Sequence, residues 1–220
     1  MKRALGMALL AMGMTATGLA SAQSGPRPGD VEYTLGPAQH FSDSFQGEGG
    51  SSLDLSSRTG VRMGVEYFTS SKLSVGFDMT WARPSYSAVL VPEDGSPEVA
   101  ISHRATVFTG HLSGSYYFLD GEFTPFVEGG LGWTYFDSNV TDGPPITGCW
   151  WDPWWGYICS SFYSTFSSTN FSYGVGAGLR WNFGRDKAVT AGYRWLEVEA
   201  DGLGKKPVLE TAVIEFAFRF

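Results

Sequence analysis

Apolar and polar residues alternate along most of this chain, in eight segments separated by stretches without such a pattern. Successive side chains of a β-strand point to opposite faces, so each segment predicts a strand with one apolar and one polar face. The predicted strands lie at about residues 30–41, 52–68, 73–81, 103–118, 123–137, 166–183, 187–199 and 208–220. The chain is therefore expected to be all-β.

The last segment has the most informative alternation. It reads VLETAVIEFAFRF, from Val208 to the final residue. Ile214, Phe216, Phe218 and Phe220 share an apolar face, whereas Glu215 and Arg219 lie in the other register. This strand is expected to place charge on one side of a sheet and aromatic rings on the other.

Tight turns and longer loops connect the segments alternately. Turn signals occur at 69–71, 120–121 and 184–186, and loops are expected near residue 49 and at 84–102, 138–165 and 201–206. The proline, glycine and acidic residues of 84–102 predict no regular strand pairing there, and Gly36-Pro37 predicts a kink or bulge. Alternating connection lengths predict an up-and-down antiparallel sheet with both termini on one side.

The N-terminus has the features of a secretory signal peptide. Lys2 and Arg3 precede an apolar run from Ala4 to Leu19 that closes with Ala-Ser-Ala. We expect residues 1–22 to be cleaved and residues 23–220 to form one domain. Cleavage changes the formal charge from −7 to −9, with 13 basic against 22 acidic residues. This acidity argues against the binding of nucleic acid or anionic lipid as a main role.

Export also bears on the two cysteines, Cys149 and Cys159. An oxidising compartment favours a disulfide between them. A metal site is not expected, because two thiolates without a nearby histidine do not complete a zinc shell. No cofactor is expected either.

Several strand sequences resemble a known family. TPFVEGGLGWTYFD (Thr124 to Asp137), SYGVGAGLRWNF (Ser172 to Phe183) and GYRWLEVE (Gly192 to Glu199) are similar to strands of the OmpA-type and OmpW-like small outer-membrane barrels. The resemblance implies an eight-stranded up-and-down antiparallel transmembrane β-barrel, exported through the periplasm to the outer membrane of a Gram-negative bacterium. The sequence ends at the last strand, so the peptidoglycan-binding domain of full-length OmpA-type proteins is not expected.

The resemblance also implies partners and an orientation. Phe216, Phe218 and Phe220 resemble the terminal signal by which outer-membrane barrels are assembled, so outer-membrane lipid and the barrel-assembly machinery are expected partners. Short connections are periplasmic and long ones extracellular in such barrels. The three tight turns and both termini are then expected in the periplasm.

The polar register is expected to face the lumen. Its charged residues are Glu32, Arg58, Arg62, Glu66, Asp78, Glu128, Arg180, Arg194, Glu215 and Arg219. Eight strands leave an interior just wide enough for side chains, so these charges must pair or hold water. They would form either an ion-paired plug or a narrow path for ions or small solutes; catalytic carboxylates are a third possibility.

The loop from Cys149 to Cys159 reads CWWDPWWGYIC and is a candidate contact site. Its aromatic residues are Trp150, Trp151, Trp154, Trp155 and Tyr157. Exposed aromatic patches usually mark contacts, which suggests an extracellular ligand such as a glycan, a host surface or a protein. Alternatively, the rings lie on the barrel rim or in the headgroup region.

His111 and Ser113 resemble the catalytic pair of outer-membrane lipid A deacylases. Both lie on the lumen register, whereas a deacylase needs them facing lipid, so no catalytic residue is expected. Gly174, Gly176 and Gly178 are not followed by a helix, so a phosphate loop is not expected. The expected function is a non-enzymatic outer-membrane barrel with a closed polar lumen and extracellular loops for surface interaction or envelope integrity. An OmpW-like narrow channel is the alternative, and a lipid A-modifying enzyme is third.

Overall fold

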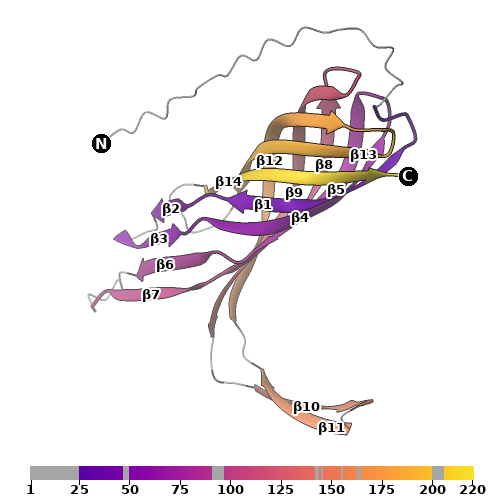
Figure 1. Cartoon of the computed structure of the whole chain (residues 1–220). Coiled ribbons are helices and arrows are strands. Elements are labelled where there is room, and N and C mark those ends of the chain that lie inside the picture. The colour runs from indigo at the N-terminus through magenta and orange to yellow at the C-terminus, as the bar shows by residue number, and fades with distance from the viewer. Residues whose placement is uncertain are drawn as a thin grey trace.

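A computed structural model describes residues 25–46, 50–90, 97–141, 144, 146–154, 156–162, 165–199 and 206–220. The expected signal peptide at 1–22 lies outside these ranges. Eight antiparallel strands form a closed barrel in the order β1-β14-β13-β12-β9-β8-β5-β4 (Figure 1). This confirms the predicted fold class. Within the described ranges, no helix is long and apolar enough to cross a membrane.

The barrel strands are close to those predicted. They are β1 (Val31–His40), β4 (Arg58–Phe68), β5 (Leu73–Ala82), β8 (Thr106–Tyr117), β9 (Phe123–Thr141), β12 (Thr165–Asn182), β13 (Lys187–Val198) and β14 (Val208–Arg219). The short connections β4–β5, β8–β9 and β12–β13 lie at the same end as Phe220 (Figure 1). We call this the turn end and the opposite end the loop end.

The last strand closes the barrel against the first. Register pairs run from Glu32 with Arg219 to His40 with Thr211. The register is the same before and after Gly36-Pro37 on both sides, so there is no bulge, but neither residue is paired with β14. Gly36 instead allows close approach, because a Cβ there would lie 1.9 Å from the carbonyl oxygen of Ile214. Pro37 removes one N–H donor without changing the register.

The barrel wall is apolar outside and polar inside. Large apolar side chains are exposed all around it, among them Tyr33, Val65, Trp81, Leu131, Trp181 and Phe216. The residues between them point inward, and many of the buried ones are charged or hydroxylated. This is the inversion that a lipid-facing barrel requires, since its outer surface meets hydrocarbon rather than water.

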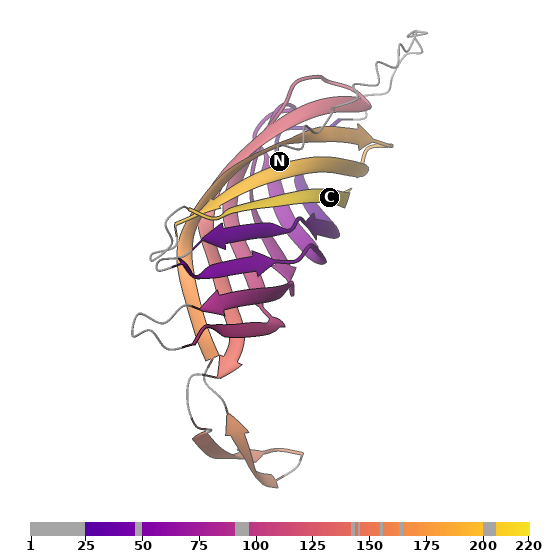
Figure 2. The ribbon, with the colours of Figure 1, turned by 90° about the vertical axis from the view of Figure 1, so that its left-hand side faces the viewer.

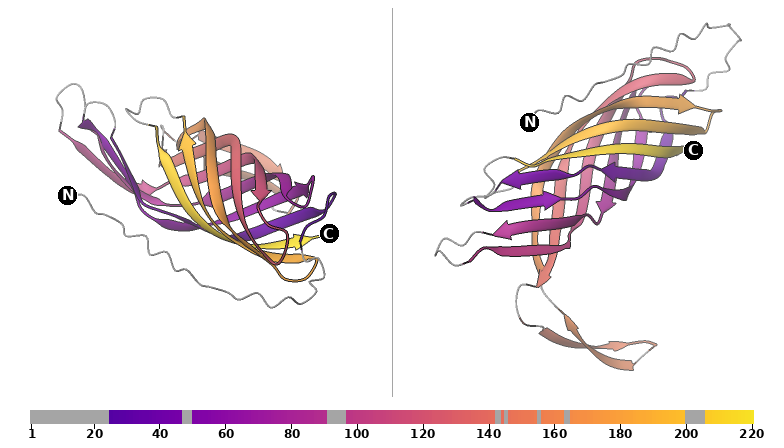
Figure 3. Two further views of the ribbon diagram at one scale, coloured as in Figure 1. Left: turned by 90° about the horizontal axis from the view of Figure 1, so that it is seen from above. Right: turned by 60° about the vertical axis from the view of Figure 1, so that its left-hand side comes forward.

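A second sheet extends the wall at the loop end. Its strands are β2 (Asp43–Gln46), β3 (Ser52–Leu55), β6 (Ser85–Leu90) and β7 (Val99–Arg104), paired in the order β2-β3-β6-β7. Figures 2 and 3 show it continuing from β1, β4, β5 and β8. The prediction of no regular pairing within 84–102 is therefore wrong. Alternation of Tyr86 and Ala88 with Ser85 and Ser87 carries the sheet past Pro84, which stands outside the strand.

The longest predicted loop also contains strands. β9 and β12 reach 19 and 18 residues, and between them β10 (Ile146–Asp152) pairs with β11 (Gly156–Phe162) as a separate hairpin. Figure 1 shows this hairpin projecting away from the barrel at the loop end. The aromatic segment that the sequence singles out is thus presented on a β-hairpin.

Candidate functional site

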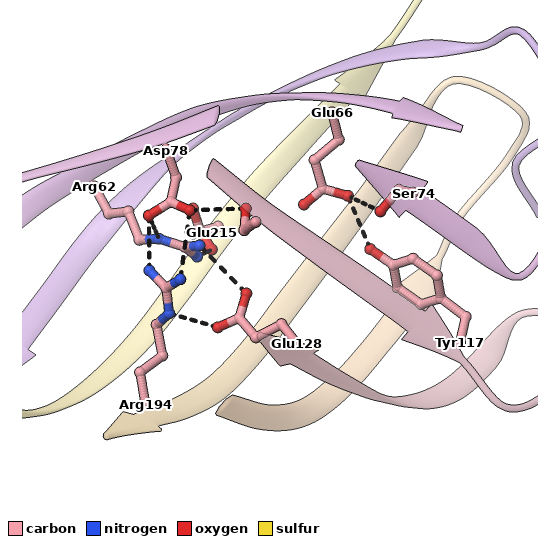
Figure 4. A network of polar contacts seen from close by, with 9 residues as sticks. Arg62, Glu66, Ser74, Asp78, Tyr117, Glu128, Arg194 and Glu215 are labelled. Carbon is pink, nitrogen blue, oxygen red and sulfur yellow. Dashed lines mark hydrogen bonds and ion pairs between the residues drawn. The ribbon is translucent and has the colours of Figure 1, made fainter. Parts of the chain in front are cut away.

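The lumen charges form two clusters, one in the middle of the barrel and one near the turn end. The middle cluster joins Arg62 and Arg194 to Asp78, Glu128 and Glu215 (Figure 4). These residues come from β4, β13, β5, β9 and β14, so the cluster crosses the lumen. All three carboxylates are buried.

The two guanidinium groups hold the carboxylates in a shared network. Arg194 Nε lies 2.6 Å from Glu128 Oε1, and its Nη1 lies 2.8 Å from Asp78 Oδ1. Arg62 lies 3.4 Å from both Asp78 and Glu128 and pairs with Glu215. Ser113 donates a further bond of 2.9 Å to Asp78. Because most of these charged groups have more than one partner, the network does not separate easily into isolated ion pairs.

The turn-end cluster centres on Glu32 of β1, whose side chain is 0% exposed. Arg180 makes two hydrogen bonds to its carboxylate, one of them 2.7 Å long, and Arg219 Nη2 donates a third at 3.1 Å. Arg180 also donates to Asn182 at 2.9 Å. Two parallel bonds from one guanidinium to one carboxylate are the strongest arrangement of this pair.

Glu66 lies in the same region but accepts only neutral donors among the hydrogen bonds of the described residues. Tyr117 donates to it at 3.1 Å and Ser74 at 2.8 Å (Figure 4). Glu66 is thus bound by hydroxyl groups rather than by an arginine.

Three aromatic rings fill the lumen beside the turn-end cluster. Phe68, Tyr117 and Phe126 are buried, with ring centroids 5.7 Å apart for both neighbouring pairs. The guanidinium of Arg180 stacks over Tyr117 at 5.3 Å and over Phe68 at 5.6 Å. The sequence pattern did not lead to a prediction of this group. Counting two residues along each strand from Glu66, Ser115 and Glu128 places all three rings on the inward register and could have identified them.

A small hydrophobic core covers the lumen at the loop end. Leu55, Tyr86, Ala88 and Ala105 are buried there against Leu53, Phe136, Val140 and Leu209. Tyr86 donates to the carbonyl of Ser138 at 3.1 Å, which ties the second sheet to β9. Between this core and the middle cluster is a cavity of about 30 Å³ lined by His40, His111 and several threonines. A polar cavity of this size has room for ordered water.

Arg58 does not lie where the sequence predicted, and His111 and Ser113 do not bond to each other. Arg58 was expected in the lumen, but it begins β4 at the loop end and is exposed, outside both clusters. Its inward register does not bury it at this junction between β3 and β4. His111 Nε2 lies 2.8 Å from Ser172 Oγ, whereas Ser113 donates to Asp78. Neither bond joins His111 to Ser113.

The β10–β11 hairpin presents exposed aromatic rings. Cys149 and Cys159 face each other across it and are joined by a disulfide. Trp151 is 68% exposed, Trp154 84% and Tyr157 73%. Gly156 provides the positive φ of 74° at the turn. Trp155 and the side chain of Trp150 lie outside the described residues.

The loop-end rim over β12, β13 and β14 carries acidic side chains. Tyr173 donates to Glu197, Tyr193 donates to Glu210 at 2.7 Å, and Lys206 lies 2.9 Å from Glu199. The hydrogen bond with Glu199 raises the pKa of Lys206 above its ordinary value. Lys206 is the one cation of this rim segment in the described chain, and it is already paired with acidic side chains.

Comparison with solved structures finds other small barrels. OprG of Pseudomonas aeruginosa is 14% identical, with 90% of this chain and 98% of that chain covered at a TM-score of 0.51. Ail of Yersinia pestis, in complex with the heparin analogue sucrose octasulfate, is 15% identical over 87% and 99% at 0.50. Neisserial surface protein A is 14% identical over 86% and 94%, also at 0.50. No curated protein sequence matches the chain.

The family model of the outer membrane protein beta-barrel domain matches residues 7–220. The similar structures share the fold, and the apolar outer wall has the surface that such a domain shows to lipid. The chain belongs to the outer membrane β-barrel family, whose members lie in the outer membrane of Gram-negative bacteria.

Proposed function

We propose that this protein is a non-enzymatic outer-membrane barrel with a closed lumen, which acts through contacts made by its extracellular hairpin β10–β11. Residues 23–220 form its barrel domain after cleavage of the signal peptide 1–22. The loop end is extracellular, because short connections are periplasmic in this family. The C-terminal strand, with Phe216, Phe218 and Phe220 exposed on its outer face, is the contact for the assembly machinery.

The single observation that carries the proposal is the exposure of Trp151, Trp154 and Tyr157 on a disulfide-closed hairpin. Exposing large aromatic side chains to water costs free energy, and exposed patches of them mark binding sites. The disulfide restrains the hairpin before contact, so less conformational entropy is lost on binding.

Packing of the lumen supports a closed interior. The middle cluster spans the barrel, aromatic rings fill it toward the turn end, and a hydrophobic core lies over it at the loop end. A conducting path would need these three layers to separate. The observations therefore favour the contact function over the OmpW-like channel.

The side-chain partners also argue against a lipid A-modifying enzyme. His111 and Ser113 lie inside the barrel, and each is bound by a lumen partner rather than by the other. A hydrolytic pair acting on lipid would need to face the outer wall.

The contact is tested with the full chain in nanodiscs on an array of neutral, acidic and sulfated glycans, and with protein-free vesicles. Sulfated glycans are included because Ail was solved with a heparin analogue. We expect binding on the array that falls at least about tenfold in a Trp151→Ala, Tyr157→Ala variant, the loss typical of aromatic hot spots.

Phe166→Ala is the matched control, because Phe166 is also an exposed aromatic residue at the loop end but lies outside the hairpin. It is expected to bind as the wild type does. Equal binding by the hairpin variant and the wild type contradicts the proposal. Binding to vesicles alone would instead assign the rings to the outer leaflet.

A further inference from the structure

The outer face of the barrel changes from aromatic to basic along β5 and β6. Trp81 and Phe108 face each other on the outer wall. The in–out alternation then continues without a break, because Ala82 and Pro84 are buried while Arg83 and Ser85 are exposed. Ser85 pairs with Arg104 of β7. Two arginines thus lie on the outward side just beyond the aromatic belt.

These arginines line a surface hollow whose described walls contain hydrogen-bond donors and no acid. Its volume is about 480 Å³, and its walls are Arg83, Ser85, Ser102, His103, Arg104 and Asn139. Neither arginine has an ion-pair partner among the described residues, in contrast to the lumen arginines. Guanidinium and hydroxyl groups arranged in this way suit a phosphate or sulfate group.

Asn139 fixes the shape of the hollow. It has a positive φ of 54°, the only such value for a non-glycine residue in the described chain. Its side-chain amide donates to the Arg104 carbonyl at 2.6 Å, and its backbone N–H donates to Asp137 at 2.8 Å. Asp137, the neighbouring acid, is bound by Asn139 and by Tyr135. Asparagine adopts this left-handed conformation readily, and the two bonds hold Asn139 in place between β7 and β9.

The height of the hollow identifies the occupant. Arg83 follows Trp81 by two residues, which is about 7 Å along a strand. A bilayer core is about 30 Å thick and about 40 to 45 Å with its headgroups, so each headgroup layer extends about 5 to 7.5 Å beyond the hydrocarbon core, where the aromatic belt lies. The hollow therefore lies at the level of outer-leaflet headgroups.

The opposite rim has the reverse charge. On the outer wall Glu210 pairs with Trp195 and Glu197 lies two residues beyond it, with Glu199 and Lys206 nearby. A phosphorylated headgroup is attracted to the β6–β7 side and repelled from the β13–β14 side. This difference in charge favours binding of such a lipid at one position on the wall rather than evenly around the barrel.

We propose that Arg83 and Arg104 bind the phosphate groups of an outer-leaflet glycolipid in this hollow, with Ser85, Ser102 and Asn139 completing the site. The site depends on the membrane orientation and not on the contact function of the hairpin. Its failure and the failure of the hairpin proposal are therefore separate outcomes.

The test measures binding of bis-phosphorylated lipid A, and of the same lipid with its phosphates removed, to the full chain in micelles by native mass spectrometry. We expect the wild type to prefer the phosphorylated lipid. Arg83→Gln with Arg104→Gln should weaken phosphorylated-lipid binding at least about tenfold and leave binding of the dephosphorylated lipid unchanged.

Lys206→Gln is the matched control, because it removes one extracellular cation that acids already hold. It should stay within about twofold of the wild type. A heat-modified gel shift confirms that each variant is folded. Equal binding of both lipids by the wild type, or unchanged binding in the double arginine variant, overturns the proposal. Inorganic phosphate that binds as tightly as the lipid overturns the assignment to a membrane lipid.

Discussion

The barrel lumen buries charged side chains and the β10–β11 hairpin exposes aromatic ones, the reverse of the distribution in a soluble protein. The lumen buries charged groups such as Glu32 and Arg180, which are 0% and 1% exposed. The hairpin exposes Trp151, Trp154 and Tyr157. The lumen charges are satisfied by one another, whereas the hairpin rings have most of their surface open to a partner.

The difference teaches which part of the chain is built for stability and which for contact. Burying a charge costs several kcal/mol unless partners compensate it, so the lumen tolerates no loss of a partner. An exposed ring contributes little to folding, so it can be replaced without unfolding the barrel. Substitutions in the two regions should therefore have opposite consequences.

The largest expected effect is on stability, from Arg180→Met. It removes both bonds to the buried Glu32 and the stacking on Tyr117, and leaves the carboxylate with Arg219 alone. We expect a loss of about 3 to 5 kcal/mol in unfolding free energy, measured by urea titration in micelles. Arg58→Met is the control, because Arg58 is exposed, and its change should stay within about 0.5 kcal/mol. Equal effects of the two substitutions would remove the distinction between the regions.

The next effect is confined to the hairpin. Closing a ring with a sequence separation of 10 residues stabilises it by about 2.5 to 3 kcal/mol in the chain-entropy model. Cys149→Ser with Cys159→Ser should therefore raise amide hydrogen exchange in β10 and β11 and leave exchange in the barrel strands unchanged. Faster exchange in the barrel strands would mean that the hairpin helps to hold the barrel together.

The smallest expected effect on stability comes from the contact residues themselves. Trp151→Ala with Tyr157→Ala should change the unfolding free energy of the barrel by less than about 0.5 kcal/mol, since both rings are mostly exposed. The same urea titration measures it. A loss comparable to that of Arg180→Met would show that these rings pack against the protein and are not free for a partner.

The sequence predicted the barrel well because its period is simple. Outward Trp181 and inward Arg180 alternate without interruption, and the lipid and the lumen impose opposite polarities on them. The inward charges follow from the same count. The grouping of these charges into two clusters cannot be read from the alternation, because Arg62 bonds to Glu215 across the lumen and the two are 153 residues apart in sequence. No local pattern encodes that distance.

Beyond the barrel rim the sequence was less informative. The sequence did not predict the second sheet (β2-β3-β6-β7), because Pro84 interrupts the alternation between β5 and β6. Tyr86 and Ala88 restore the alternation directly afterwards. Arg58 was misplaced because alternation assigns a face of the strand but not whether other elements cover that face at a given height. The basic hollow needs both the face and the height, and it therefore emerged only in three dimensions.

Conductance measurements test whether the lumen is closed. The full chain reconstituted in planar bilayers, with insertion verified by protease protection, should give no discrete single-channel steps at neutral pH in 1 M KCl. Such a result follows from a middle cluster and an aromatic layer that fill the barrel in succession. Reproducible discrete steps from the wild-type protein, lost in a heat-denatured sample, would contradict the account and favour the channel.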